Sequence, residues 1–203
     1  MLLIALFCST TINAQGIKIY QKSGEVIDIP YNNIDSIIAF GDKNKDDKSV
    51  DLGLSVRWAT CNVGATSPEE YGDYFAWGET EPKEIYNSGT YEQSIYKKYN
   101  TKDGKTILDL EDDAAHVNWG DKWRIPSIEE RNELIENCTW EWTTYNDVAG
   151  FKAISNKTGN AIFLPAVGYR GSDNPYYPAG KYGLYWLRDV QSSTYAYLLL
   201  IKY

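Results

Sequence analysis

The sequence predicts a mixed α+β domain built from short helices and antiparallel strands, and three observations carry this prediction. Ser127 and Glu130 form a capping box, in which each side chain can bond the backbone amide of the other residue. Residues 139–145 alternate in the manner of a strand, with Trp140 and Trp142 on one face. Short apolar runs separated by Gly, Asn and Pro then continue along the chain, which is typical of strands joined by turns.

The helix that begins after Ser127 is the best-defined element. Pro126 disfavours helical geometry at Ile125, so the chain enters the helix in an extended conformation. Apolar and long side chains then recur at three- and four-residue spacing as far as Cys138. This spacing predicts about three helical turns with one face to bury.

The first 14 residues, MLLIALFCSTTINA, are an apolar run that ends in small and polar residues. This run resembles a secretory signal peptide cleaved after Ala14, which implies a secreted or cell-surface protein. A lipoprotein anchored at Cys8 is the less favoured alternative, because Phe7 stands where a lipid-attachment site has a small residue. The run is too short for a membrane span, so no span is expected after cleavage.

Three further segments follow the signal. Residues 15–41 alternate around Lys22, Ser23 and Gly24 and predict a small N-terminal β-ribbon, a hairpin module that cannot stand alone. Residues 42–49 are charged and read as a linker. Residues 50–203 form the main domain, in which we expect strands at residues 52–58, 151–155, 161–165, 183–189 and 195–203 and a helical turn at 110–116 capped by Asp109.

Composition excludes some partners. The chain has 203 residues, 43% of them hydrophobic, and a net charge of -8. That hydrophobic content is ample for a core. Nucleic acids and anionic membranes both need a cationic protein surface, so neither is expected as a partner.

Two cysteines, Cys61 and Cys138, remain after signal removal. In an oxidising compartment they are candidates for one disulfide. Two separate buried thiols are the alternative.

The run WRIPSIEERNELIENC, residues 123–138, resembles the W-R-[LIM]-P-[ST]-x-x-E-[WF]-x-x-L motif of the Fibrobacter succinogenes major paralogous domain family. Residues 50–83, 110–127 and 161–171 match further parts of the family pattern. The resemblance implies a C-type-lectin-like fold, related to that of formylglycine-generating enzymes, in a secreted or surface protein of the kind common in gut Bacteroidota. Arg131 departs from the pattern, which usually has an aromatic residue there, and WLRDV (residues 186–190) replaces a serine-rich segment.

Some C-type lectins hold calcium through carboxylates, so the acidic run Glu111, Asp112 and Asp113 is a weak metal candidate. Solvated or helix-capping carboxylates are the favoured interpretation, and no cofactor is expected. His116 could pair with Asp112 or Asp113, but no nucleophile motif accompanies it. A structural histidine is therefore preferred.

The segment YRGSDNPYYPAGKYGLYW, residues 169–186, is rich in tyrosine and glycine. Flat amphipathic rings beside hydrogen-bonding groups suit sugar or protein surfaces, and in the family's fold such loops usually carry the ligand. The candidate ligand-binding residues are Arg170, Asp173, Asn174, Tyr176 and Tyr177. The alternative is that these tyrosines cover the sheet.

These observations favour a non-catalytic secreted or surface binding module for glycan or protein ligands. One alternative is a structural component of a surface appendage, in which an open C-terminal strand edge accepts a partner strand. A carbohydrate-active enzyme is the second alternative, since acidic residues that could serve as its carboxylate pair are plentiful.

Overall fold

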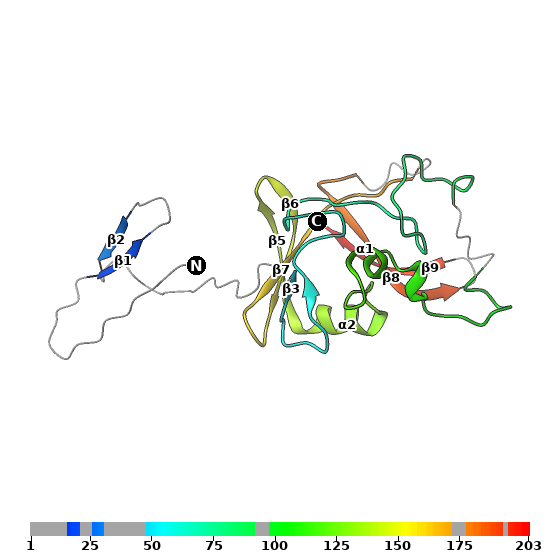
Figure 1. Cartoon of the computed structure of the whole chain (residues 1–203), viewed down its shortest axis with the longest axis horizontal. Helices are drawn as coiled ribbons and strands as arrows, with labels where there is room; N and C mark the ends of the chain where they lie inside the picture. Colours follow the sequence, from blue (N-terminus) through cyan, green and yellow to red (C-terminus); the bar gives the residue numbers. More distant parts are fainter. Residues whose placement is uncertain (1–15, 21–25, 31–47, 92–97, 172–177, 193–194) are drawn as a thin grey trace. The chain divides into compact units, whose positions relative to one another are not determined.

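The predicted N-terminal hairpin is present in the computed structural model, which describes residues 16–20, 26–30, 48–91, 98–171, 178–192 and 195–203 (Figure 1). Strand β1, Gly16–Tyr20, pairs antiparallel with β2, Val26–Pro30, with Ile17 opposite Ile29 and Ile19 opposite Ile27. The chain divides into two compact units, Met1–Asp47 and Lys48–Tyr203. The predicted signal peptide and most of the predicted linker lie outside the described residues.

The central helix of the second unit, α2, spans Ile128–Asn137 and confirms the predicted capping box. The Ser127 hydroxyl accepts from the Glu130 amide at 3.3 Å, and the Ser127 amide donates to the Glu130 carboxylate at 2.8 Å. Arg124 clamps the same carboxylate with two nitrogen atoms, at 2.8 and 2.5 Å. Asp189, from a strand far along the chain, accepts from the Ile128 amide at 2.8 Å. The helix start is therefore joined to the rest of the unit by charged hydrogen bonds.

A three-stranded antiparallel sheet follows α2 directly, in the order β5-β6-β7. Strand β5 spans Cys138–Tyr145, β6 spans Val148–Ser155 and β7 spans Ala161–Pro165. The β5–β6 turn consists of Asn146 and Asp147, whose φ angles are 45° and 64°. Two consecutive positive φ angles define the type I′ turn that matches strand twist. The predicted strands at 151–155 and 161–165 are thus confirmed.

The first core cluster lies against the inner face of this sheet. It contains Leu52, Leu134, Cys138, Ala153 and Ile162, and Trp58 and Trp140 pack against it.

The prediction of one strand over residues 52–58 is wrong. Only β3, Ser49–Val50, and β4, Trp58–Ala59, pair with each other. Between them, Gly53 takes a φ of 67° and its amide donates to the Asp51 side chain, which folds the chain back. This fold places Leu52, which is fully buried, in the core. Tertiary burial has overridden the local alternation.

The last two strands form a long hairpin. Strand β8, Tyr182–Ser192, pairs antiparallel with β9, Tyr195–Lys202, which confirms both predicted C-terminal strands. Isolated bridges join Gly168 to Gly183 and Ile107 to Asp189 on β8. In the described part of the chain, β9 has β8 as its one strand neighbour.

Loop segments are tied to β8 by aromatic side chains that donate to backbone carbonyls. The Trp77 indole donates to the Leu187 carbonyl at 2.8 Å, and the Trp186 indole donates back to the Phe75 carbonyl at 2.9 Å. Tyr91 donates to the Trp77 carbonyl at 2.7 Å. Trp77 is also a member of the second core cluster, together with Tyr99 and Leu108. These bonds fix a stretch of chain that has little regular structure of its own.

Cys61 and Cys138 are separate buried thiols, so the disulfide prediction is wrong and the alternative holds. The Cys61 thiol donates a hydrogen bond to the Ala65 carbonyl, with the sulfur 3.4 Å from the oxygen. Cys138 belongs to the first core cluster, where burial raises the pKa of its thiol. Each cysteine is therefore used as a small core residue.

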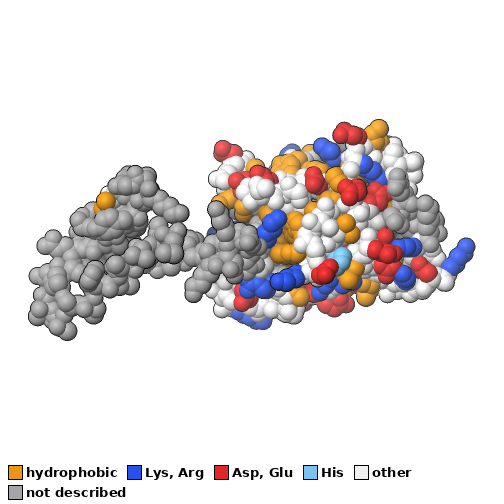
Figure 2. Space-filling model, in the orientation of Figure 1, with side chains coloured by type: hydrophobic (Ala, Val, Ile, Leu, Met, Phe, Trp, Pro, Cys, Tyr) orange, Lys and Arg blue, Asp and Glu red, His pale blue; other side chains and the backbone are white. Residues whose placement is uncertain are grey.

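The fold is a mixed α+β fold with several small antiparallel sheets. Among the described residues, no helix combines the length and apolar character needed to cross a membrane. On the face shown in Figure 2, acidic and basic side chains are interspersed over the main unit and do not form a field of one sign.

Candidate functional site

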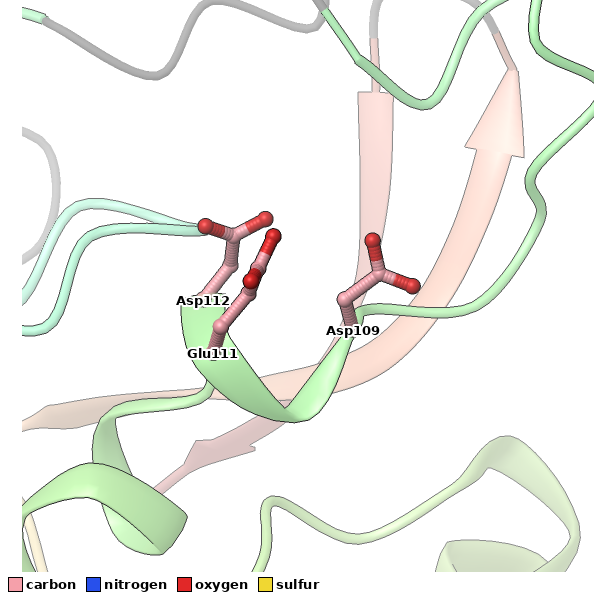
Figure 3. A group of neighbouring side chains, drawn as sticks. All are labelled: Asp109, Glu111 and Asp112. Atoms are coloured by element: carbon pink, nitrogen blue, oxygen red, sulfur yellow. The ribbon is translucent and has the colours of Figure 1, made fainter.

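Three acidic residues gather at one turn of 3-10 helix, Leu110–Asp112, of which Asp109 is the N-cap residue. Oxygen atoms of Asp109, Glu111 and Asp112 all lie within 4.8 Å of one another (Figure 3). Asp109 was missed as a site candidate, although its three-residue spacing from Asp112 would bring the two together in a 3-10 turn. Three carboxylates so arranged have the ligand chemistry of a calcium site.

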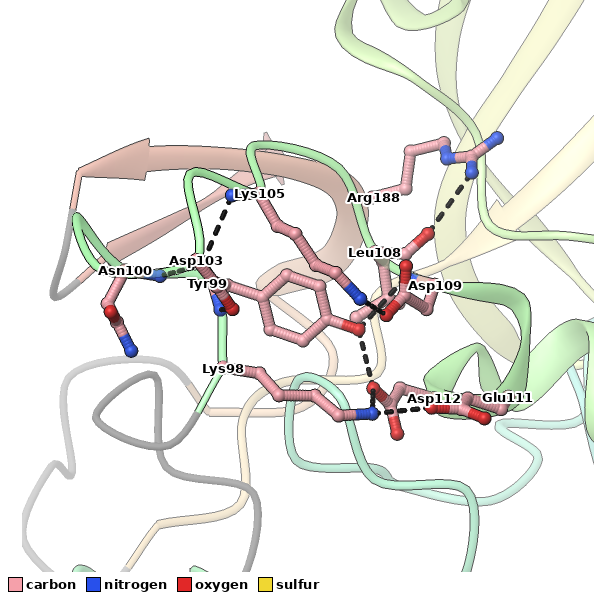
Figure 4. A network of polar contacts seen from close by, with 10 residues as sticks. All are labelled: Lys98, Tyr99, Asn100, Asp103, Lys105, Leu108, Asp109, Glu111, Asp112 and Arg188. Carbon is pink, nitrogen blue, oxygen red and sulfur yellow. Dashed lines mark hydrogen bonds and ion pairs between the residues drawn. The ribbon is translucent and has the colours of Figure 1, made fainter.

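Two lysines already occupy this cluster (Figure 4). The Lys98 ammonium lies 2.6 Å from Glu111 and 2.8 Å from Asp112, and Lys105 forms an ion pair with Asp109. The hydrogen bond to Asp112, followed by that to Glu111, raises the pKa of Lys98 above its usual range. Three carboxylates and two ammonium groups leave one net negative charge. A divalent cation would have to displace both lysines, so the arrangement is a closed ion-pair network.

Tyr99 closes the network on the core side. Its hydroxyl donates to Asp112, and it accepts from the Asp109 amide at 2.9 Å. Burial and the bond to Asp112 raise the pKa of the Tyr99 hydroxyl. Since only 2% of Tyr99 and 5% of Asp112 are exposed, this part of the network is structural.

A shallow groove lies beside the network. Its volume is about 220 Å³, and residues of the 99–106 turn and the end of β8 line it, among them Asn100, Lys105 and Gln191. Ligand pockets usually measure about 300–1,000 Å³. The groove is therefore small for anything beyond a single ring or side chain.

Asp113, the third predicted metal candidate, has a different role. Its side chain is fully buried and caps helix α1, Ala114–Trp119, by accepting from the amides of Ala115 and His116 at 3.0 Å each. It also accepts from the Ile125 amide at 2.9 Å. The metal assignment for Asp113 is thus wrong, because three backbone donors use its oxygens. The predicted helical turn at 110–116 is instead a 3-10 turn followed by α1.

His116 does not pair through its imidazole with Asp112 or Asp113 in the described structure. Its Nε2 lies 3.7 Å from the carboxylate of Asp121, whose side chain is fully exposed. The buried Nδ1 has no hydrogen-bond partner among the described residues. His116 therefore does not form, with Asp112 or Asp113, the histidine–carboxylate pair that activates a nucleophile.

The base of the tyrosine-rich loop is the remaining predicted site. Asp173, Asn174, Tyr176 and Tyr177 lie outside the described residues. Arg170 is described and exposed, and its guanidinium carbon lies 4.8 Å from the ring centroid of Tyr74. This is a cation–π contact. Tyr74 was missed by sequence reasoning, because it lies 96 positions earlier in an aperiodic loop and no local pattern links the two.

Both sides of the loop base are anchored to the fold. The Gly168 amide donates to the Tyr182 carbonyl at 2.6 Å, and the Gly180 amide donates to the Ala166 carbonyl at 2.8 Å. Tyr74 donates through its hydroxyl to the Val167 carbonyl at 2.5 Å. These bonds hold Tyr74 at the point where the chain leaves the sheet towards Arg170.

Tyr169 lies beside Gly171 at the same place. A Cβ atom built on Gly171 would lie 2.3 Å from the Tyr169 ring, so the ring rests directly against the glycine backbone. Tyr169 remains 43% exposed. Tyr169 and Arg170, which are consecutive in the sequence, are therefore both exposed at the loop base.

Comparisons of the chain with protein-family models, with curated proteins and with solved structures found no match. No relative therefore assigns a role to Arg170 or to the acidic cluster.

Proposed function

We propose that the protein is a non-catalytic binding module, exported or displayed at the cell surface, that binds its ligand at the loop base formed by Tyr74, Tyr169 and Arg170. The observation that carries the proposal is the exposed Arg170 guanidinium, stacked 4.8 Å from Tyr74. Within the described residues, no carboxylate lies at ion-pair distance from it.

Physical reasoning favours binding at this place. An arginine usually loses side-chain entropy when it binds, and stacking on a fixed ring removes part of that loss in advance. Tyr74 is itself fixed by its bond to Val167. The two groups are thus held ready for a ligand.

Two further points support a non-catalytic role. The carboxylates of the acidic cluster are ion-paired with Lys98 and Lys105, and Asp121, the acid beside His116, is fully exposed. Acid–base catalysis needs titratable groups poised near a substrate. The fold we propose is C-type-lectin-like, which the motif at residues 123–138 and the ordered matches around it support.

The test is a glycan and surface-protein array probed with the full exported chain, as wild type and as Arg170→Ala. We expect ligand retention by the wild type and its loss in the variant, with an unchanged melting temperature because Arg170 is exposed. Equal retention by both proteins would place binding elsewhere, and a large fall in stability would assign Arg170 to packing.

A second candidate function is assembly through the edge of β9. Strand β9 pairs with β8 along one side, and Tyr195 is 67% exposed. On the other side, Arg131 donates to the Leu198 carbonyl at 3.4 Å. An apolar edge strand can accept a partner strand.

Sedimentation of the full chain would test this assembly. We expect association that Leu200→Lys, a charge placed on the exposed part of the edge, abolishes. A monomer across the accessible concentration range would reject the candidate.

A further inference from the structure

We infer that the partner that binds the edge of β9 is a second copy of this chain, and that the two β9 strands pair antiparallel about a two-fold axis at Leu200. This inference rests on the assembly function proposed above and names its partner and its register. It follows from three features of the edge: the direction of its backbone groups, the side chains beside them and the charges near them.

The backbone groups of Leu198, Leu200 and Lys202 point away from β8. The Tyr203 amide donates to the Lys181 carbonyl, so these two residues form a hydrogen-bonded pair at the end of the β8–β9 ladder. In an antiparallel ladder, hydrogen-bonded pairs alternate with pairs whose amides and carbonyls face outwards. The register continues without irregularity from Lys202 to Leu198, so every second residue of this stretch faces outwards.

The middle of this edge is open. Arg131 donates to the outward carbonyl of Leu198 at 3.4 Å, which agrees with the direction derived from the ladder. Within the described part of the chain, the outward amides and carbonyls of Leu200 and Lys202 have no hydrogen-bond partner. Unpaired groups along a strand edge form a template for another strand.

One antiparallel register uses all of the outward residues. When Leu200 lies opposite the partner subunit's Leu200, each Leu198 lies opposite a Lys202, and every such pair can exchange two hydrogen bonds. The Leu198 carbonyl can keep its bond to Arg131, because a carbonyl oxygen has two lone pairs. A shift of two residues in either direction would leave an outward residue of each copy without a partner. Since the same patch serves on both copies, the contact closes as a dimer.

The side chains near the axis are apolar and exposed. Leu200 is 41% exposed, whereas Leu199 and Ile201 on the opposite face of β9 are buried. Ile135, one helical turn beyond Arg131 on α2, is 44% exposed. In the proposed register the two Leu200 side chains become direct neighbours on one face, which removes apolar surface from water. Pairing also extends a two-stranded sheet to four strands, and sheets of two strands are the least stable.

The charges near the edge limit the strength of the contact. Lys202 faces the partner subunit's Leu198, so like charges do not lie directly opposite each other. Lys202 does approach the partner subunit's Arg131, which bonds that Leu198, and each copy carries a net charge of -8. Salt screens both repulsions. The paired segment, residues 198–202, is also short against the roughly 20–30 residues that each side of a standard interface contributes. We therefore expect a weak dimer that added salt strengthens.

The experiment combines sedimentation with disulfide trapping of the full chain. Sedimentation compares the wild type with Leu200→Lys, at about 0.05 M and about 0.5 M salt. Leu200→Cys places a thiol on the axis, where the Cα atoms of a hydrogen-bonded pair lie about 5.5 Å apart, within the range of a disulfide. Lys202→Cys and Tyr195→Cys are matched controls, since they place the same thiol at exposed positions of β9 away from the axis. The native cysteines are buried, so they add little background.

We expect the wild type to dimerise with rising concentration, and more strongly at the higher salt concentration. Leu200→Lys should weaken the dimer by about 100-fold, because two like charges then face each other. On mild oxidation, Leu200→Cys should form a linked dimer and the two control variants should stay monomeric.

The other outcomes separate the register from the assembly function. Linkage of Lys202→Cys in place of Leu200→Cys, or of no variant while Leu200→Lys still abolishes association, would overturn the register and leave assembly through the edge standing. Particles larger than a dimer would overturn the closed contact alone. Dimerisation unaffected by Leu200→Lys, or a monomeric wild type at both salt concentrations, would overturn this inference together with the assembly function.

Discussion

Replacing Asp113 with alanine removes the acceptor of three backbone amides, one of them buried and two partly buried. Asp113 accepts from Ala115, His116 and Ile125 at 2.9–3.0 Å, and its side chain is fully buried. It thereby joins the start of α1 to the extended chain that enters α2. Its negative charge also acts on the neighbouring Arg124.

The expected magnitude follows from this count. Each buried donor left without a partner costs about 1–3 kcal/mol, so Asp113→Ala should lower the unfolding free energy by about 4 kcal/mol. Asp113→Asn keeps Oδ1, which accepts from the α1 amides and, at 3.1 Å, from the Ile125 amide, but it replaces the oxygen that lies 2.9 Å from the Ile125 amide with an NH2 group, so it should cost about 2 kcal/mol. These are large fractions of a typical domain stability of about 5–15 kcal/mol.

The assay is urea unfolding of the full chain, followed by tryptophan fluorescence. The control is Asp121→Asn, an exposed carboxylate near the same helix, which should change stability by less than about 0.5 kcal/mol. A loss below about 1 kcal/mol for Asp113→Ala, at an unchanged denaturant slope, would refute the capping role.

Three more predictions concern acid sensitivity, calcium and packing. The hydrogen bond from Arg124, chief among several causes, lowers the pKa of Glu130 below its ordinary value of 4.5. Its stabilising effect is thus present above pH 4.5 and lost as pH falls through the folded-state pKa. Glu130→Gln should therefore lower the urea midpoint at pH 7 and have little effect near pH 2; an equal loss at both pH values would contradict this. Calcium or chelator should shift the melting temperature of the wild type by less than about 1 °C, because Lys98 and Lys105 occupy the acidic cluster; a clear rise with calcium would reject the closed network. Gly150→Ala should destabilise by about 1–3 kcal/mol in urea unfolding, because the added Cβ would lie 2.4 Å from the Leu164 carbonyl oxygen; wild-type stability would show that the sheet yields there.

Elements with strong local signals were predictable. The capping box at Ser127 and Glu130 and the strand with Trp140 and Trp142 depend on residues within a few positions of one another. Turn residues such as Asn146 and Asp147 delimit the hairpin that follows. Short-range hydrogen bonds and alternation suffice for such elements.

What depends on distant residues was not predictable. Residues 52–58 looked like one strand, yet the chain folds back at Gly53 because core packing outweighs alternation. Asp113 looked like a metal ligand, and only the approach of Ile125 shows how its second oxygen is used. Tyr74 belongs to the candidate site because its ring contacts Arg170, which lies 96 positions later in the sequence.

The carbonyl-directed aromatic bonds have a consequence for how order in this unit would be measured. A side chain that donates to a carbonyl fixes the backbone in place, but it does not shield that residue's own amide hydrogen from solvent. The side chains of Trp77, Tyr91 and Trp186 hold the irregular segments around Phe75, Trp77 and Tyr91 in this way. These segments can hold their positions while exchanging amide hydrogens quickly with deuterated solvent. Rapid exchange in these segments would therefore show that their amides are not hydrogen-bonded, and it would not show that the segments move. Side-chain probes such as indole fluorescence would be needed to measure how firmly they are held.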